Sequence, residues 1–280
     1  MDFETPEAPP EAGEGPYDPT SFDSPVVRAV APLLVVAAAL GVRSSRLGFL
    51  FEGFHVWIHE VGHASVAWLS GRPAIPLPFG WTNVEPDKSF ILCGVMLAGL
   101  VLLGVTGWRE RKAWPMVLAA ALLAAQAYMT WRLPDDRARL WMIFGGVGGE
   151  FYLSAAMACL FFFEFPEKFR WGACRYVVLF IGAASFAQSY SFWKRVKGGL
   201  EGIPYGSLIN GEDDGGGDMN ILAGDYHWTQ HQIVTTYNHL ADACLAAMVA
   251  TYLFFNLRLD RVFNPLLARL LAIGLVARDP

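Results

Sequence analysis

The sequence carries little charge for its length. Of its 280 residues, 17% are Asp, Glu, Lys or Arg, whereas soluble domains usually hold about a quarter. The hydrophobic residues make up 54% of the chain and gather into long runs instead of alternating with polar ones. A membrane-spanning helix needs about 20 largely apolar residues, and several runs approach that length. The shortage of charge therefore favours an integral membrane protein.

Other absences exclude other classes of protein. The net charge of −5 and the lack of a basic cluster argue against a nucleic-acid partner. The cysteines show no CxxC spacing and no disulfide framework, so we expect them to be small buried side chains: Cys93, Cys159, Cys174 and Cys244. Residues 1–25 hold six prolines and seven acidic residues but no lysine or arginine, which predicts a disordered tail and not a signal peptide.

Seven apolar segments are candidate membrane spans. They are Val26–Val42, Leu47–Leu69, Phe90–Gly107, Ala113–Trp131, Leu140–Phe163, Cys174–Trp193 and Ile233–Phe255. Tryptophans lie near the ends of several of them, as in interfacial aromatic belts. We therefore expect an all-α fold, a polytopic transmembrane helix bundle with about seven spans, short loops and one long acidic and glycine-rich loop.

The spans define three regions. Residues 1–25 form the acidic, proline-rich tail, residues 26–257 the transmembrane domain, and residues 258–280 a C-terminal amphipathic segment. The longest loop, residues 194–232, contains a run of acidic residues and glycines from Gly211 to Asp218. A long loop in a compact protein is usually functional or disordered.

The second apolar segment contains the motif His59-Glu60-Val61-Gly62-His63. On a helix, His59 and His63 project from nearly the same face one turn apart, so two imidazoles can bind one zinc ion at about 2.0–2.1 Å each. Glu60 is turned by about 100° from His59 and can take a proton from the attacking water without binding the metal. Ionisable groups inside a membrane span are costly and usually functional, although a polar cluster that only joins neighbouring helices remains the alternative.

An HEVGH sequence in an apolar helix, followed by a small-residue turn and a proline-containing segment, resembles the site-2 protease family of intramembrane zinc metalloproteases and its bacterial relatives. The resemblance covers about residues 55–85. It implies that His59 and His63 bind Zn²⁺, that Glu60 is the catalytic base, and that an aspartate at the start of a later helix is the third ligand. Asp218 is favoured because an apolar segment follows and can anchor it. Asp214, in Asp214-Gly215-Gly216, is the alternative.

Several further residues carry open alternatives. His55 continues the histidine stripe, either as support for the site or as a hydrogen-bond partner of a neighbouring helix. Glu150, in the middle of the fifth span, either orients a zinc ligand and lines a water path or makes a neutral helix contact. Gln188 is expected to form an interhelical hydrogen bond. Residues Ala74–Val84 are either short edge strands that pair with an extended substrate, as the resemblance implies, or an ordinary loop.

The leading hypothesis is a membrane-embedded zinc metallopeptidase that cleaves a membrane protein or peptide, with the lipid bilayer as its surroundings and, by the resemblance, a bacterial inner membrane as its location. A di-iron oxygenase or desaturase is one alternative, because HxxxH also occurs at His227 and His231, but the HxxHH boxes typical of that class are absent from this sequence. A non-catalytic protein that keeps the fold is another, and haem ligation lacks any distinctive motif.

Overall fold

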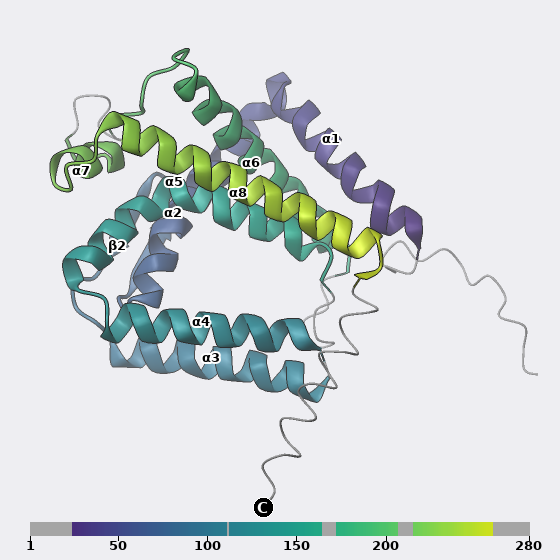
Figure 1. Ribbon diagram of the computed structural model, residues 1–280, viewed down its shortest axis with the longest axis horizontal. Helices are drawn as coiled ribbons and strands as arrows, with labels where there is room; N and C mark the ends of the chain where they lie inside the picture. Colours follow the sequence, from purple (N-terminus) through teal and green to yellow (C-terminus); the bar gives the residue numbers. More distant parts are fainter. Residues whose placement is uncertain (1–23, 111, 164–171, 207–214, 260–280) are drawn as a thin grey trace, which may run out of the picture.

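The computed structural model describes residues 24–110, 112–163, 172–206 and 215–259 (Figure 1). The described elements are α1 (Ala31–Arg43), α2 (Phe49–Leu69), β1 (Ala74–Leu77), β2 (Trp81–Val84), α3 (Phe90–Arg109), α4 (Ala113–Trp131), α5 (Asp135–Leu160), α6 (Cys174–Lys197), α7 (Asp218–Gly224) and α8 (Gln230–Asn256). A π-helical turn at Val26–Val30 leads into α1. Asp214, most of the acidic tail and residues 260–280 of the C-terminal segment lie outside the described residues.

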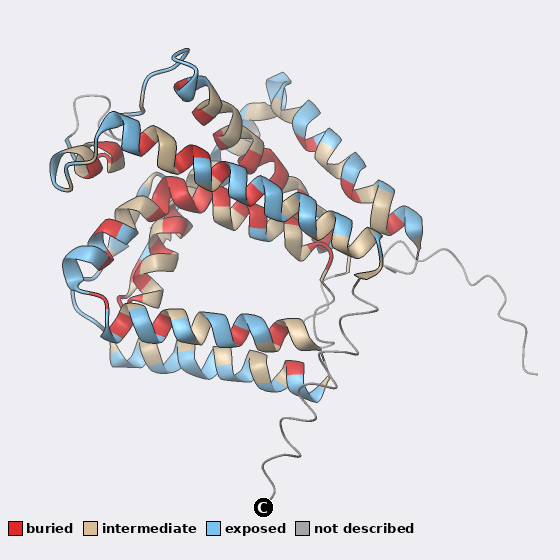
Figure 2. Cartoon of the chain, viewed as in Figure 1, coloured by how far each residue is buried: buried red, intermediate tan, exposed pale blue. Residues whose placement is uncertain are grey.

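Helix α5 forms the centre of the bundle. It packs against α2, α6, α7 and α8, and Figure 2 shows that buried residues concentrate on it. One large cluster of buried side chains joins α5 to α6, α7 and α8; its members include Phe151, Phe186, Trp193, Met219, Leu222, Ile233 and Tyr237. The cluster anchors the short helix α7, which would have no stability alone.

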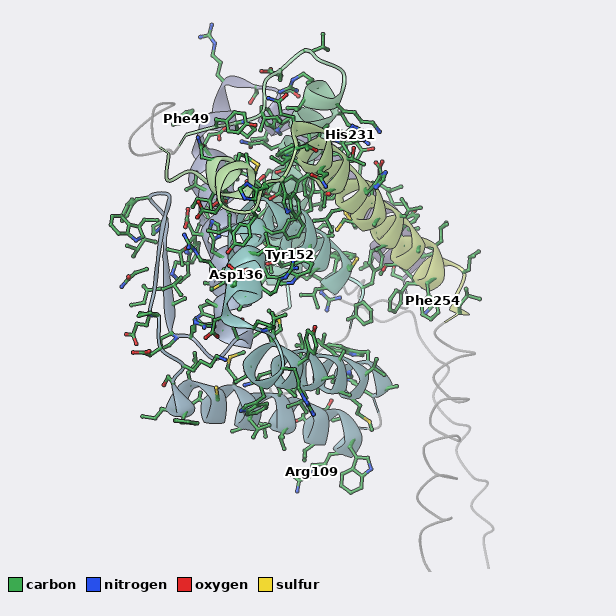
Figure 3. The ribbon with its side chains drawn as sticks, turned by 60° about the vertical axis from the view of Figure 1, so that its left-hand side comes forward. Phe49, Arg109, Asp136, Tyr152, His231 and Phe254 are labelled. Carbon is green, nitrogen blue, oxygen red and sulfur yellow. The ribbon has the colours of Figure 1, made fainter. Side chains whose placement is uncertain are left out.

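Glycines bring α2 and α5 into close contact. A side chain on Gly145 would place its Cβ 2.9 Å from the carbonyl oxygen of Gly62, so neither helix could approach as closely with a larger residue there. The hydroxyl of Tyr152, labelled in Figure 3, donates a hydrogen bond of 3.0 Å to the same carbonyl. Lipid is as apolar as leucine, so such close packing and hydrogen bonds hold helices together inside a membrane. The motif on α2 is therefore pressed against α5.

The proline-containing segment after α2 is a hairpin. Strands β1 and β2 pair in antiparallel register, with Ala74 opposite Val84 and Leu77 opposite Trp81. Gly80 takes a φ of 83° in the turn, which residues with a Cβ rarely adopt. Of the two alternatives left open for residues Ala74–Val84, the structure therefore shows strands.

One edge of this hairpin is covered by α2. The indole nitrogen of Trp68 donates to the carbonyl of Ala74 at 3.0 Å, and that of Trp57 donates to the carbonyl of Pro76 at 3.3 Å. Pro76 has no N–H to offer a further strand. The outer edge of β1 is thus occupied by tryptophans, and a third strand can add to this hairpin at β2.

Among the described residues, five helices are long and apolar enough to cross a membrane: Val26–Arg43, α3, α4, α5 and α8. The expected seven spans are not confirmed, because α2 and α6 have the length but not the hydropathy. Both helices carry polar residues toward α5, including His59 on α2 and Ser189 on α6. Helices α3 and α4 pair with each other and are largely exposed (Figure 2). In Figure 3, Arg109 at the end of α3 lies at the bottom of the view. Phe49 and His231, which are near the starts of α2 and α8, lie at the top.

Candidate metal centre

The two histidines of the motif are held by hydrogen bonds at Nδ1. His63 Nδ1 lies 2.7 Å from the carbonyl oxygen of Met142, and His59 Nδ1 lies 2.8 Å from Oε1 of Glu150. A carbonyl can only accept, so Nδ1 of His63 donates; the Glu150 carboxylate accepts from His59 in the same way. When each imidazole is neutral, its proton is therefore on Nδ1 and its lone pair is on Nε2. An imidazole binds a metal in this state.

Three ligand atoms form a nearly equilateral triangle. The Nε2 atoms of His59 and His63 are 3.1 Å apart, and Oδ2 of Asp218 lies 3.2 Å from the first and 3.3 Å from the second. Ligands about 2.05 Å from a tetrahedral zinc ion are about 3.3 Å from one another. The triangle therefore has the size of one face of a zinc coordination tetrahedron.

The surroundings of the Asp218 carboxylate also favour a cation at this position. Its Oδ2 is buried and has no hydrogen-bond partner among the described residues, although buried carboxylate oxygens normally have one. Burial alone would raise the pKa of Asp218, but the neighbouring His63 and His59 hold that pKa well below its ordinary value. An oxygen in this position is suited to bind a cation.

Gly146 leaves the room that the centre needs. A Cβ at this position would lie 2.5 Å from Oδ2 of Asp218, from Nε2 of His59 and from Cε1 of His63. Cβ atoms essentially never come closer than 3.0 Å to another heavy atom. Any residue other than glycine would therefore displace the three candidate ligands. Together, the triangle, the orphaned oxygen and this space fit a zinc ion.

Asp218 is placed by the residues that follow it. It begins α7, and Met219 and Leu222 bury their side chains in the core of α5, α6 and α8. The side-chain oxygen of Asn220 accepts a hydrogen bond of 2.7 Å from the backbone N–H of Gly206. This bond joins α7 to the segment that follows α6. The apolar segment that favoured Asp218 in the sequence is thus what anchors it in the structure.

Glu60 lies beside the triangle. Its side chain is buried, and one carboxylate oxygen lies within 4.8 Å of ligand nitrogens of both histidines. The hydroxyl of Thr82 on β2 lies 2.5 Å from Oε2 of Glu60 and donates to it. A carboxylate this close to both histidines is placed to take a proton from a water molecule beside them, as a general base must.

Glu150 connects the centre to a second polar group. Its Oε2 accepts a hydrogen bond of 2.5 Å from Ser189 on α6 and lies 3.5 Å from Nε2 of His55. His55 also bonds Ser185 on α6 through Nδ1 at 2.9 Å. Glu150 therefore orients His59, and His55 both joins a neighbouring helix and supports Glu150. The interhelical hydrogen bond expected for Gln188 is present, 2.9 Å to Glu52 on α2.

The centre opens into a cavity of about 630 Å³ whose lining includes β2 as well as the ligands. A second cavity of about 460 Å³ has Arg43 and Arg195 in its lining. Three polar residues line both cavities: Glu52, His55 and Glu150. The second cavity, beside the ends of α1 and α6, therefore adjoins the cavity of the metal centre across a polar wall.

Comparison of the chain with models of known protein families, with curated proteins and with solved structures finds no match. The function therefore has to be argued from the site. Sequence reasoning identified His59, Glu60, His63 and Asp218, which the structure brings together. It missed Gly146, Thr82, Ser189 and the carbonyl of Met142. For Gly146 the glycine run was a signal of close approach, whereas nothing in the sequence singles out the other three.

Proposed function

We propose that the chain is a multi-pass membrane zinc metallopeptidase that hydrolyses a peptide bond of a membrane protein or peptide in a bacterial plasma membrane. The observation that carries the proposal is the triangle of His59, His63 and Asp218 with Glu60 beside it. The resemblance of the motif to the site-2 protease family supports the same reaction and the bacterial location. On this proposal α2 and α6 also cross the membrane, which makes seven spans.

The chain's own residues divide the work of hydrolysis. His59, His63 and Asp218 would hold the zinc ion, while Glu150 and the carbonyl of Met142 fix the two imidazole rings. Bound zinc supplies a Lewis acid that activates water and polarises the scissile carbonyl. Glu60 takes the proton of the attacking water and delivers it to the leaving amine. General acid–base catalysis of this kind typically raises the rate by about 10²- to 10⁴-fold.

The open edge of β2 is suited to hold an extended substrate. The N–H of Glu85 donates to the carbonyl of Pro73 at 2.9 Å, one step beyond the pair of Ala74 and Val84. Hydrogen-bonded and non-bonded pairs alternate along an antiparallel ladder, so the backbone groups of Thr82 and Val84 point away from β1. Both residues line the cavity of the metal centre. A peptide paired with them would pass beside the histidines.

The competing functions have less support. A di-iron enzyme needs a second set of ligands, and in the described part of the chain the one group of three such side chains that could hold a metal is His59, Glu60 and His63. His227 and His231, which suggested a further box, are exposed. A non-catalytic relative would have no need of the buried Glu60. The peptidase accounts for this residue.

The test uses the purified full-length protein in liposomes with a pool of synthetic transmembrane peptides, whose cleavage is followed by mass spectrometry. The wild type should contain one zinc ion per chain and cleave members of the pool. Glu60→Gln should retain the zinc and lose at least about 10²-fold in rate. Asp225→Asn, a change at an exposed carboxylate near Asp218 in sequence, is the control and should cleave normally. Equal cleavage by the wild type and Glu60→Gln would refute the proposal.

A further inference from the structure

Thr82 is bonded to Glu60 and has its backbone on the open edge of β2. Its Oγ1 lies 2.5 Å from Oε2 of Glu60 and 3.0 Å from the carbonyl oxygen of the same residue. A hydroxyl has one proton, and the shorter, charge-assisted bond to the carboxylate is the stronger. No other described residue hydrogen-bonds this carboxylate. The direction of the Glu60 side chain therefore depends on Thr82.

The position of that hydroxyl follows the backbone of β2. Threonine is branched at Cβ and stiff at χ1, so Oγ1 moves with the strand and not independently of it. Trp57 and Trp68 hold the outer edge of β1, so the edge left open for a further strand is that of β2. A peptide that paired with the open edge would immobilise Thr82, and with it Glu60.

We propose that Thr82 is a positioning residue that aims the Glu60 carboxylate at the attacking water and does so most fully when an extended substrate pairs with β2. This inference rests on the proposed function. Glu60 is then most effective as a base when an extended peptide is paired with β2. Binding energy along the strand edge then raises kcat as well as lowering KM, because it is used to orient the reacting groups.

The experiment compares three variants of the full-length protein in liposomes. Thr82→Val keeps the shape and removes the hydroxyl, Thr82→Ser keeps the hydroxyl, and Asn83→Ala changes the exposed neighbour as a control. The substrate is a synthetic transmembrane peptide that the wild type cleaves, with and without backbone N-methylation near the cleaved bond, which blocks strand pairing. Zinc per chain, kcat and KM are measured for each combination.

Thr82→Val should retain zinc and lose about 10- to 100-fold in kcat, as expected for a misplaced reacting group, with KM changed less than about twofold. Thr82→Ser should recover most of the loss. N-methylation should lower kcat in the wild type but not further in Thr82→Val. Wild-type kcat in Thr82→Val, an equal loss in Thr82→Ser, or a rise in KM alone would overturn the inference.

Two further outcomes are distinct. If Thr82→Val loses the zinc, Thr82 supports the metal centre as a whole and the positioning role is refuted. If the wild type and Glu60→Gln cleave alike, the proposed function itself fails and the role of Thr82 falls with it. An active wild type whose kcat is insensitive to the Thr82 hydroxyl refutes the inference alone.

Discussion

Substituting Gly146 with alanine is the most direct test of the metal centre. The change adds a single methyl group on α5, and the wild-type backbone conformation is helical, so alanine fits the helix itself. Alanine is favoured over glycine within a helix by about 0.8–1.0 kcal/mol in water. Any loss of metal therefore cannot be attributed to a weakened α5.

The size of the effect follows from the distances. The added Cβ would lie 2.5 Å from Asp218 Oδ2 and from His59 Nε2, while ordinary contacts begin at 3.4 Å. The ligands or the helix must therefore move by about 0.5 Å to reach 3.0 Å and by about 0.9 Å to restore an ordinary contact, whereas metal sites tolerate about 0.2 Å in ligand distance. Loss of a supporting contact alone costs about 10- to 100-fold in metal affinity. Gly146→Ala should exceed this and bind zinc at least about 100-fold more weakly.

The assay is competition for zinc between the purified protein and a chromophoric chelator, with circular dichroism to check that the helices remain. Gly53→Ala is the matched control, because it adds the same methyl group to α2 at a position with no atom within 4 Å. It should bind zinc like the wild type. Zinc binding by Gly146→Ala at wild-type affinity would show that His59 and Asp218 do not share an ion beside this helix.

Four other changes test the surrounding structure. Asp218→Asn should lower zinc affinity by at least about 100-fold, and Asp225→Asn should leave it unchanged, in the same chelator assay; equal affinities would require another third ligand. Glu150→Gln should lower zinc affinity by about 10- to 100-fold without removing a ligand, and wild-type affinity would mean that it does not orient His59. Zinc at 100 times its Kd should stabilise the protein by about 2.7 kcal/mol against thermal unfolding, and a chelator should reverse this; an unchanged Tm would argue against a specific site. Gly62→Ala should destabilise the fold by about 1–3 kcal/mol by forcing α2 from α5, measured by unfolding, and neutrality would contradict the close contact.

The sequence could predict the features of the site that depend on residues close together in the chain. The spacing of His59 and His63 fixes their relation on any helix, and the structure confirms the helix over Phe49–Leu69. The preference for Asp218 also had a local basis, because the apolar residues after it predict an anchored segment. The structure places Met219 in the core, and Asp218 beside the histidines.

What the sequence could not predict depends on contacts between distant segments. The role of Glu150 follows from which face of α5 meets α2, and that of Thr82 from the register of a hairpin. Glycine at position 146 differs from its glycine neighbours only in facing the ligands. The span count was uncertain for a related reason. Helix α2 carries polar groups that serve other helices and not lipid, and these lower its hydropathy below that of an ordinary span.

The tryptophans that cover β1 have a consequence for where a substrate can be cut. A peptide can join this hairpin on one side, and its residues then face α2 and the opposite side in turn. Sliding the peptide by one residue would exchange every inward side chain for an outward one. On the proposed function, alternative scissile bonds within one substrate should therefore be separated by an even number of residues, because two indole rings leave the peptide a single edge on which to alternate.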